Sequence, residues 1–291
     1  MKKLVSLLLA AVLALSMVAC GNTDTDEKDG AENKGPVTAE VVEYDLTEEL
    51  YAFGVDKTQP ELLDKVNAFV KKIKEDGTLE AICEKYFEGG EPTPVTSAKL
   101  DETKDQLVVA TNAAFEPFEY MEGDKYLGID MEIAALLAQE LGQELVIQNM
   151  DFDAVCLTVG QQKCDIAMAG LTVSEDREEY VTFSESYYEA SQKLIVRSDD
   201  DTFAECESAD DVIALLNEMT EEVSIGVQAG TTGQLFVEGD EDWGFEKLPV
   251  KCVAYKNGSL AVQDMLNGNI DYVIIDAAPA ASITEAMNEM Q

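Results

Sequence analysis

The feature that most constrains the fold is a regular alternation of strand-like and helix-like segments from residue 107 onward. The expected strands are 107–111, 144–148, 165–169, 192–197, 223–228, 251–255 and 271–275, and the expected helices are 130–141, 152–161, 209–219, a helix from 232, 259–266 and 279–290. Strands that alternate with helices form a largely parallel sheet covered by helices. The two series, on either side of the long strand 192–197, therefore predict two α/β lobes.

A different pattern precedes this alternation. Apolar residues at helical spacing predict a helix over 62–73, with Pro60 in its first turn and Gly77 past its end, and a second helix over 79–87. The stretch 89–106 begins with glycines and prolines and breaks every periodicity. We interpret this stretch as a linker.

The N-terminus has the pattern of an export signal. Two lysines precede an apolar run, Leu4–Ala19, that is short for a membrane span. The run ends in Met17-Val-Ala-Cys20, which resembles a bacterial lipobox whose cysteine is lipid-modified; ordinary signal cleavage is the alternative. We expect a signal peptide over 1–19, a flexible polar tether over 20–38, and an exported protein held by Cys20 to the outer face of the bacterial cytoplasmic membrane.

Composition excludes several classes of partner. The net charge of −39 would repel nucleic acid and anionic lipid headgroups over most of the surface. The chain contains no histidine and its six cysteines form no CxxC pair, so we expect neither a metal site nor a cofactor. The cysteines are interpreted as mostly buried thiols, with Cys206 and Cys252 as the one candidate disulfide. We expect a monomer.

One of only two arginines, Arg177, follows the strand that ends at Ala169. A guanidinium offers a planar fork of donors that binds a carboxylate through two parallel hydrogen bonds, which lysine cannot do. The alternative is an internal salt bridge to one of three neighbouring acids, Glu175, Asp176 or Glu178.

Polar residues gather at the carboxyl ends of the expected strands, where open α/β sheets bind ligands. They are Asn112, Gly170, Thr172, Gln228, Thr232 and Asp276. The cleft between the two lobes is therefore the candidate site.

Four motifs together resemble the polar amino-acid-binding family of extracytoplasmic solute-binding proteins, close to the glutamine-binding branch. They are Leu107–Tyr120, Gly128–Ala138, Met150–Asp153 and Gly170–Arg177. The resemblance implies a two-lobed periplasmic-binding-protein-like fold of type II, a ligand in the interlobe cleft, no catalysis, and an ABC permease in the membrane as partner.

The order of the segments departs from that family, because residues 39–88 resemble its C-terminal segment. We therefore expect a circular permutation; a rearranged fragment that does not rejoin the fold is the alternative. The expected division is lobe 1 over 39–192 (39–88, then the linker 89–106, then 107–192), a hinge strand over 193–198, and lobe 2 over 199–291. The chain would then cross covalently between the lobes only once, at 192–198, with residues 41–44 alongside that strand through hydrogen bonds alone. We therefore expect a looser hinge than in an unpermuted relative.

The resemblance also implies roles at the two charged ends of the ligand. Arg177 would hold the α-carboxylate, with Thr172 and the backbone amide of Thr232. Asp276 would take the ammonium group, together with the Gly170 carbonyl and the Thr172 hydroxyl. An aspartate at this position can also be a simple helix cap, and the Gly-Thr-Thr segment before Thr232 lacks the lysine of a nucleotide-binding loop.

The remaining implied contacts concern the ligand side chain. Phe115 and Phe152 would form walls around its aliphatic part, although aromatic residues in such lobes are also ordinary core residues. Asn112, Gln228 and Ile275 would set the side-chain end, and none of them carries a charge. A neutral polar amino acid is therefore expected, because a buried cation would lack a counter-ion. The competing classes are a dehydratase-like enzyme, a sensory module and an adhesive surface lipoprotein.

Overall fold

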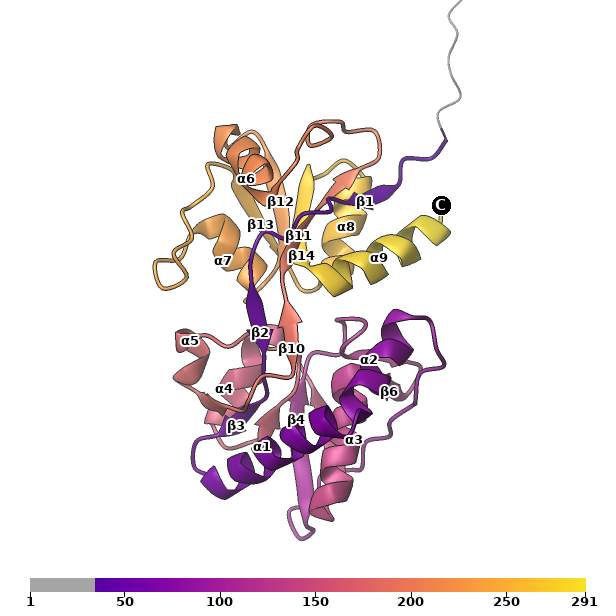
Figure 1. Cartoon of the computed structure of the whole chain (residues 1–291), viewed down its shortest axis with the longest axis vertical. Coiled ribbons are helices and arrows are strands. Elements are labelled where there is room, and N and C mark those ends of the chain that lie inside the picture. The colour runs from indigo at the N-terminus through magenta and orange to yellow at the C-terminus, as the bar shows by residue number, and fades with distance from the viewer. Residues whose placement is uncertain (1–34) are drawn as a thin grey trace, which may run out of the picture. The chain divides into compact units, whose positions relative to one another are not determined.

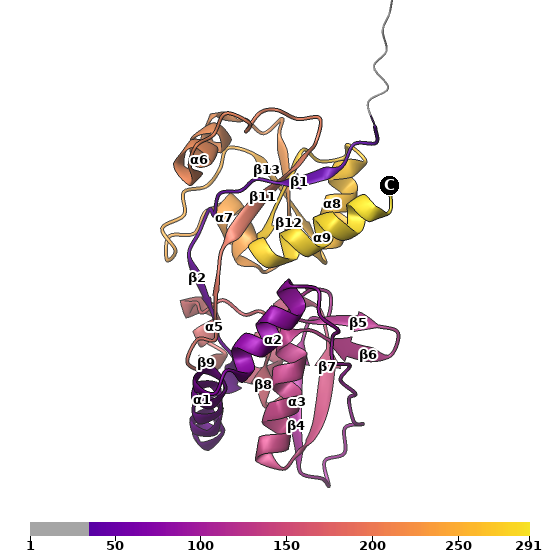
Figure 2. The same ribbon diagram turned by 45° about the vertical axis from the view of Figure 1, so that its right-hand side comes forward.

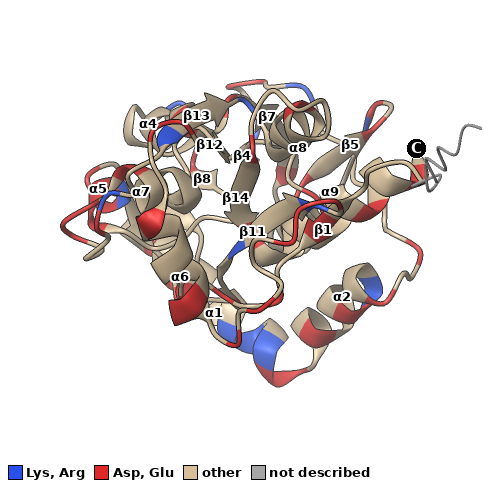
Figure 3. Ribbon diagram, turned by 90° about the horizontal axis from the view of Figure 1, so that it is seen from above, with Lys and Arg blue, Asp and Glu red and all other residues tan. Residues whose placement is uncertain are grey.

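The computed structural model describes residues 35–291. The expected signal peptide, Cys20 and most of the expected tether lie outside these residues. No helix within 35–291 has the length and apolar character needed to cross a membrane. Acidic residues occur on most elements of the described chain, with a group of lysines on α1 (Pro60–Glu75) (Figure 3).

The first sheet has the strand order β7-β4-β8-β3-β9. Its strands are β3 (Gly54–Asp56), β4 (Gln106–Thr111), β7 (Glu144–Asn149), β8 (Ile166–Ala167) and β9 (Val181–Phe183). The strands β5 (Tyr120–Glu122) and β6 (Lys125–Leu127) form a separate two-stranded hairpin. β4 runs parallel to β7 and β8, whereas β3 is antiparallel to its neighbours. The segment before the linker thus supplies a strand to the middle of this sheet.

Helices cover both faces of the first sheet, because side chains of β4 alternate between two cores. Leu107 and Val109 pack with α1, α2 (Thr78–Phe87) and α3 (Ile129–Leu141), while Val108 and Ala110 pack with α4 (Val155–Gly160). A 3₁₀ turn, η1 (Phe152–Ala154), precedes α4, and the short α5 (Glu175–Glu178) leads into β9. Figure 1 shows α1, α2 and α3 together along this sheet.

The second sheet has the strand order β1-β11-β14-β12-β13. Its strands are β1 (Ala39–Val41), β11 (Gln192–Arg197), β12 (Ser224–Gln228), β13 (Lys251–Tyr255) and β14 (Tyr272–Asp276), and its helices are α6 (Ala209–Glu218), α7 (Thr232–Glu238), α8 (Gly258–Leu266) and α9 (Ala277–Glu289). The parallel strands β13, β12 and β14 confirm the expected α/β pattern, and β11 and β1 extend the sheet in antiparallel fashion.

The position of β1 corrects the expected lobe boundary. β1 pairs with β11, from Ala39 opposite Arg197 to Val41 opposite Ile195, and the side chain of Asn288 on α9 bonds both to the backbone N–H and to the carbonyl of Ala39. The two strands lie side by side in Figures 1 and 2. β1 therefore belongs to the second sheet, and the N–H groups of Val42 and Leu46 donate to the β11 carbonyls of Leu194 and Gln192, so residues 39–46 lie with the second lobe and not with the first.

The expectation of a single covalent crossing is also wrong. From β1 the chain continues through residues 42–48 to β2 (Glu49–Tyr51) and into the first sheet, and it returns through β10 (Tyr188–Ala190) to β11. β2 and β10 pair antiparallel with each other. The two connections are thus covalent and hydrogen-bonded side by side, which removes the reason to expect an unusually loose hinge.

Gly128 shows why one of the recognised motifs needs glycine. Its φ of +119° is a conformation that other residues rarely adopt, and a Cβ atom there would lie 2.1 Å from the carbonyl oxygen of Phe118. Its carbonyl accepts the N–H of Glu132 in the first turn of α3, and its own N–H donates to the Tyr86 hydroxyl. The close backbone contact fixes α3 against the segment that carries Phe115 and Glu119.

The cysteines in the described chain are all free thiols. Cys156 and Cys164 are buried, whereas Cys83, Cys206 and Cys252 are partly exposed. The candidate disulfide between Cys206 and Cys252 is therefore not formed. Burial raises the pKa of the Cys252 thiol to about 12, helped by the nearby Glu238, so this thiol carries a proton at neutral pH.

Candidate functional site

Two of the predicted residues meet directly although they belong to different sheets. Asn112 directly follows β4 and Gln228 ends β12, and both are almost fully buried. The Gln228 side-chain amide donates to the Asn112 side-chain carbonyl at 3.1 Å, and the Asn112 amide donates to the Met150 carbonyl at 2.7 Å. The carboxyl ends of strands from the two sheets therefore face one another.

Arg177 is held by neutral groups. Its Nη1 donates to the Thr172 carbonyl at 2.6 Å, its Nη2 donates to the Gly230 carbonyl at 3.1 Å, and its guanidinium carbon lies 5.2 Å from the centre of the Phe152 ring. The cation over the aromatic face and the two carbonyls fix the plane of the guanidinium.

No ion pair joins Arg177 to any carboxylate within residues 35–291, so the alternative of a salt bridge to Glu175, Asp176 or Glu178 is not realised. A guanidinium has five N–H donors, and the two bonds above use two of them. The Arg177 guanidinium therefore has N–H donors left that can bind an anion.

Asp276 lies at the end of β14 in the position before α9, but its side chain forms no cap hydrogen bond. Its Oδ1 instead accepts a hydrogen bond of 2.5 Å from the hydroxyl of Tyr51 on β2. Burial and the charge of Glu49 raise the pKa of Asp276 to about 7, against the lowering effect of the Tyr51 bond. The helix-cap alternative is therefore wrong for this side chain.

Residues that the sequence reasoning missed surround this carboxylate. Glu49 on β2 is buried; its Oε2 accepts from the Thr172 hydroxyl at 2.7 Å, and its Oε1 accepts from the Gln192 amide at 2.9 Å. Glu49 and Tyr51 point to the same side of β2, since side chains two apart in a strand share a face. The only sequence signal for these two residues was their spacing of two, which places Glu49 and Tyr51 on one face of a strand ahead of the first expected helix.

A second buried acid supports Gly170. Asp130 on α3 is fully buried; its Oδ2 accepts from the Gly170 N–H at 2.9 Å and its Oδ1 accepts from the Tyr187 hydroxyl at 2.6 Å. Burial raises the pKa of Asp130 to about 7, although both hydrogen bonds lower it. Gly170 has φ of +53°, and a Cβ there would lie 2.9 Å from Cε1 of Phe115.

Phe115 itself is a core residue, since it is 4% exposed and packs with Phe118 at a ring distance of 6.2 Å. Both interpretations of Phe115, as wall and as core, remain compatible with this position. Phe152 is less buried and contacts Arg177.

Several buried polar atoms near these residues lack a hydrogen-bond partner within the described chain. They are Oγ1 of Thr111 and Thr232, Oε1 of Gln192 and Gln228, and both carboxyl oxygens of Glu119. Such atoms are rare in folded proteins because each costs about 1–3 kcal/mol. Most of them belong to the ends of strands or to the segments directly after them, where the predicted site residues lie.

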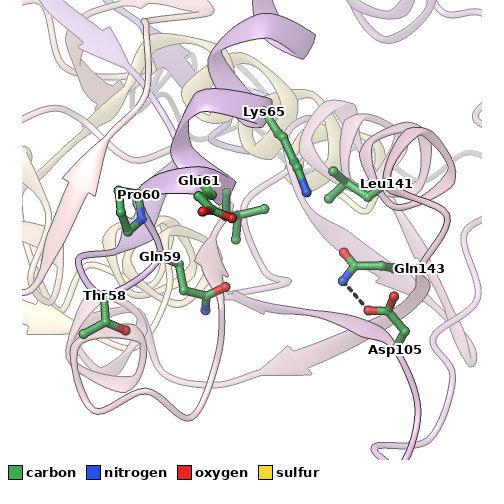
Figure 4. A pocket seen from close by; sticks show the side chains of 9 residues that line it. Thr58, Gln59, Pro60, Glu61, Lys65, Asp105, Leu141 and Gln143 are labelled. Atoms are coloured by element: carbon green, nitrogen blue, oxygen red, sulfur yellow. Dashed lines mark hydrogen bonds between the residues drawn. The ribbon is translucent and has the colours of Figure 1, made fainter.

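A separate cleft of about 520 Å³ lies elsewhere, between the start of α1 and the end of α3. Figure 4 shows its polar lining, including the hydrogen bond from the Gln143 amide to Asp105. It contains none of the residues predicted from the sequence, and we do not assign it to the site.

Comparison with known proteins places the chain in a family. The sequence model of "Bacterial extracellular solute-binding proteins, family 3" matches residues 107–278. The arginine-binding extracellular protein ArtP of Bacillus subtilis (strain 168) is 35% identical over 96 residues, which are 33% of this chain and 38% of that protein. The ABC transporter arginine-binding protein 1 of Escherichia coli (strain K12) is 26% identical over 176 residues, 60% of this chain and 64% of that protein.

Solved structures of amino-acid-binding proteins also resemble the chain over about two thirds of its length. An ancestral arginine-binding protein bound to arginine has a TM-score of 0.53 at 30% identity and covers 63% of this chain and 75% of its own. An ancestral amino acid-binding protein described as a precursor of cyclohexadienyl dehydratase also has a TM-score of 0.53, at 25% identity, over 72% of this chain and 78% of its own.

The chain spans less than two thirds of the length of these two curated relatives. The match of the family model nevertheless covers more than half of the chain, including β4, α3, the segment around Arg177 and the strand that ends in Asp276. The protein therefore has a two-lobed periplasmic-binding-protein fold and belongs to the bacterial extracellular solute-binding proteins, family 3.

Proposed function

We propose that the protein is the exported amino-acid-binding component of an ABC importer and that it captures its ligand between the lobes by hinge closure. The observation that carries the proposal is that the two charged site residues, one in each lobe, lack a partner of opposite charge. Arg177 in the first lobe has no carboxylate partner, and the buried Asp276 in the second lobe has no cationic partner within residues 35–291. A zwitterionic amino acid supplies both missing charges.

The carboxylate end of the ligand is assigned to Arg177, with Thr172 and the backbone amide of Thr232. Arg177 is already oriented by the Thr172 carbonyl and the Phe152 ring, so little side-chain freedom is lost on binding. Thr232 is buried at the start of α7, and its hydroxyl oxygen is unpartnered.

The ammonium end is assigned to Asp276, the Gly170 carbonyl and the Thr172 hydroxyl oxygen. The Thr172 hydroxyl donates its proton to Glu49 and so keeps its lone pairs for a donor from the ligand. The Gly170 backbone is fixed by Asp130.

The side-chain end is assigned to Asn112 and Gln228, with Phe115 and Phe152 as walls. The two amides bond to each other, and the free Gln228 oxygen accepts a donor. This favours a neutral polar amino acid such as glutamine. A basic amino acid is the second candidate, because relatives are named for arginine and histidine and because buried acids lie close by.

Titration calorimetry of the purified mature protein against the twenty amino acids and cystine tests the proposal. We expect at least one neutral polar amino acid to bind with micromolar affinity, about −8 kcal/mol. The matched control is the same compound without its α-carboxylate, which should not bind. If no amino acid binds, the function is wrong; tight binding of arginine alone contradicts only the neutral side-chain preference.

The lipid anchor, the circular permutation and the choice of a binding protein over an enzyme can each be tested separately. The anchor at Cys20 is inferred from the lipobox resemblance, and partition of the full-length protein into the aqueous phase of a detergent extraction would exclude it. The circular permutation is supported by β3, which lies inside the first sheet although the family match begins only at residue 107. Superposition that ignores chain order should bring residues 47–88 onto the last segment of the relatives. Turnover of cyclic dienoic acids would favour the dehydratase alternative to a binding protein.

A further inference from the structure

Glu49 is a buried carboxyl group that accepts three hydrogen bonds and forms no ion pair within residues 35–291. Its Oε1 accepts from the Thr47 hydroxyl at 2.7 Å and from the Gln192 side-chain amide at 2.9 Å. Its Oε2 accepts from the Thr172 hydroxyl at 2.7 Å. Three donors around one buried carboxyl group favour its ionised form, because each bond stabilises the negative charge.

The backbone keeps Thr172 beside Glu49. Residues 171–173 are bonded to β2 through two backbone hydrogen bonds of 3.0 Å, and the Thr172 side chain is almost fully buried. An ionised carboxylate can only accept hydrogen bonds, so the Thr172 hydroxyl has to donate its single proton to Glu49. The hydroxyl oxygen therefore keeps only lone pairs for other partners.

Gln192 connects Glu49 to the second lobe. It is the fully buried first residue of β11, and it lies opposite Asp276 in the antiparallel pairing of β11 with β14. Its side-chain amide donates to Glu49, and its backbone N–H donates to the Thr47 hydroxyl at 2.9 Å. Glu49 thus bonds to Thr172 in the first lobe and to the strand neighbour of Asp276 in the second.

Given the amino-acid ligand of the proposed function, on which this inference rests, we propose that Glu49 is a positioning residue for the ammonium end of the site. Glu49 holds the Thr172 proton and so makes the hydroxyl oxygen an acceptor only. An α-ammonium group supplies the N–H donor that this oxygen needs. A 2-oxo acid supplies none and leaves the oxygen unpaired, which is costly in a buried site. Glu49 therefore acts on the ligand through Thr172.

Glu49→Gln tests this role because it keeps the size of the side chain and replaces one acceptor oxygen by a donor. The nitrogen of the Gln192 side-chain amide can only donate, so the remaining oxygen at position 49 should stay on that side. The new amide nitrogen then faces Thr172, whose hydroxyl has to accept and turns its proton away from residue 49. That proton would oppose the N–H donor of the ligand.

Titration calorimetry measures the effect on binding. Each of the twenty L-amino acids is titrated into wild type, and the tightest binder is used for all variants. Glu49→Gln should weaken its binding by about 10- to 100-fold. The matched control, Glu48→Gln, makes the same change at the exposed neighbouring acid and should stay within about twofold of wild type. In a Thr172→Val background, Glu49→Gln should change affinity by less than about threefold, because the residue through which Glu49 acts is gone.

Proton magnetic resonance of the ligand-free protein locates the Thr172 proton without any ligand. A buried hydroxyl proton donated to a carboxylate should exchange slowly and resonate downfield, because charge-assisted O–H···O bonds are short and strong. We expect such a resonance in wild type, its absence in Thr172→Val and an upfield shift in Glu49→Gln. If Glu49→Gln does not fold, a through-space cross-peak between this proton and the Glu49 side chain in wild type decides the question.

The outcomes distinguish this inference from the proposed function. Wild-type affinity in Glu49→Gln, or an equal loss with and without the Thr172 hydroxyl, would overturn the positioning role while the binding function stands. The absence of the downfield resonance in wild type would overturn it as well. If none of the twenty amino acids binds wild type, the proposed function falls and the role toward a ligand falls with it, whereas the resonance still shows whether Glu49 holds the Thr172 proton.

Discussion

Arg177→Ala should reduce affinity for the amino-acid ligand by about 30-fold to more than 1,000-fold, which corresponds to about 2–5 kcal/mol. The loss is large because the ligand carboxylate would remain buried without its bidentate partner. Folding should be little affected, since the Arg177 side chain bonds only to two backbone carbonyls and forms no ion pair within residues 35–291. Titration calorimetry measures the affinity and urea unfolding the stability.

The chain provides its own control for this experiment. Arg197, the other arginine, forms an exposed ion pair with Asp199 at 3.0 Å. Arg197→Ala should leave affinity unchanged and change stability by less than about 1 kcal/mol. Arg177→Lys should recover only a small part of the binding, because an ammonium group lacks the planar fork. Near-native affinity in Arg177→Ala would refute the carboxylate assignment.

Asp276→Asn should have opposite effects on binding and on stability. Binding should weaken by about 2–5 kcal/mol, because the ligand ammonium group would lose its only carboxylate contact among the assigned residues. The ligand-free protein should become more stable at pH 8. Burial and the charge of Glu49 raise the folded pKa of Asp276 to about 7, so its ionisation opposes folding above the unfolded-state pKa, and the amide removes this cost.

The comparison should be made at pH 5 and at pH 8. The stabilisation by Asp276→Asn should be small at pH 5, where the folded wild type carries the proton, and should grow toward pH 8. Asp271→Asn is a useful control, since Asp271 is an exposed residue whose carboxylate bonds to Ser224 and not to the site. Equal affinity of Asp276→Asn and wild type would exclude Asp276 as the ammonium partner.

Long elements could be predicted from the sequence, and short ones could not. The strand 192–197 and the strand 251–255 occur with the expected ends, because each contains at least three consecutive apolar residues that are bounded by polar or charged ones. β2, β3 and β10 have three residues each, too few for a period-two pattern to be recognised. Their absence from the prediction is the reason that the second covalent connection between the lobes was missed.

Arg177 and Asp276 could be named from the sequence because motif and chemistry agreed for both, and their roles toward a ligand stay predictions that the two variants above test. The other buried acids could not be named in this way. Glu49 is buried because β2 places it against Gln192 and Thr172. Both partners are more than 120 residues away in the sequence, so the local pattern cannot reveal this burial. Glu119 lies within the motif Leu107–Tyr120, but the residues around it in the sequence do not indicate that its side-chain oxygens lack hydrogen-bond donors.

The paired strands β2 and β10, which belong to the two connections between the lobes, also carry a residue of the candidate site. Tyr51 belongs to this two-stranded ribbon, and its hydroxyl donates a hydrogen bond to the carboxylate of Asp276 in the second lobe. In the proposed complex, a ligand ammonium group at Asp276 would compete with the Tyr51 hydroxyl for the same carboxylate. Binding of the ligand would then act directly on the β2–β10 ribbon that connects the lobes.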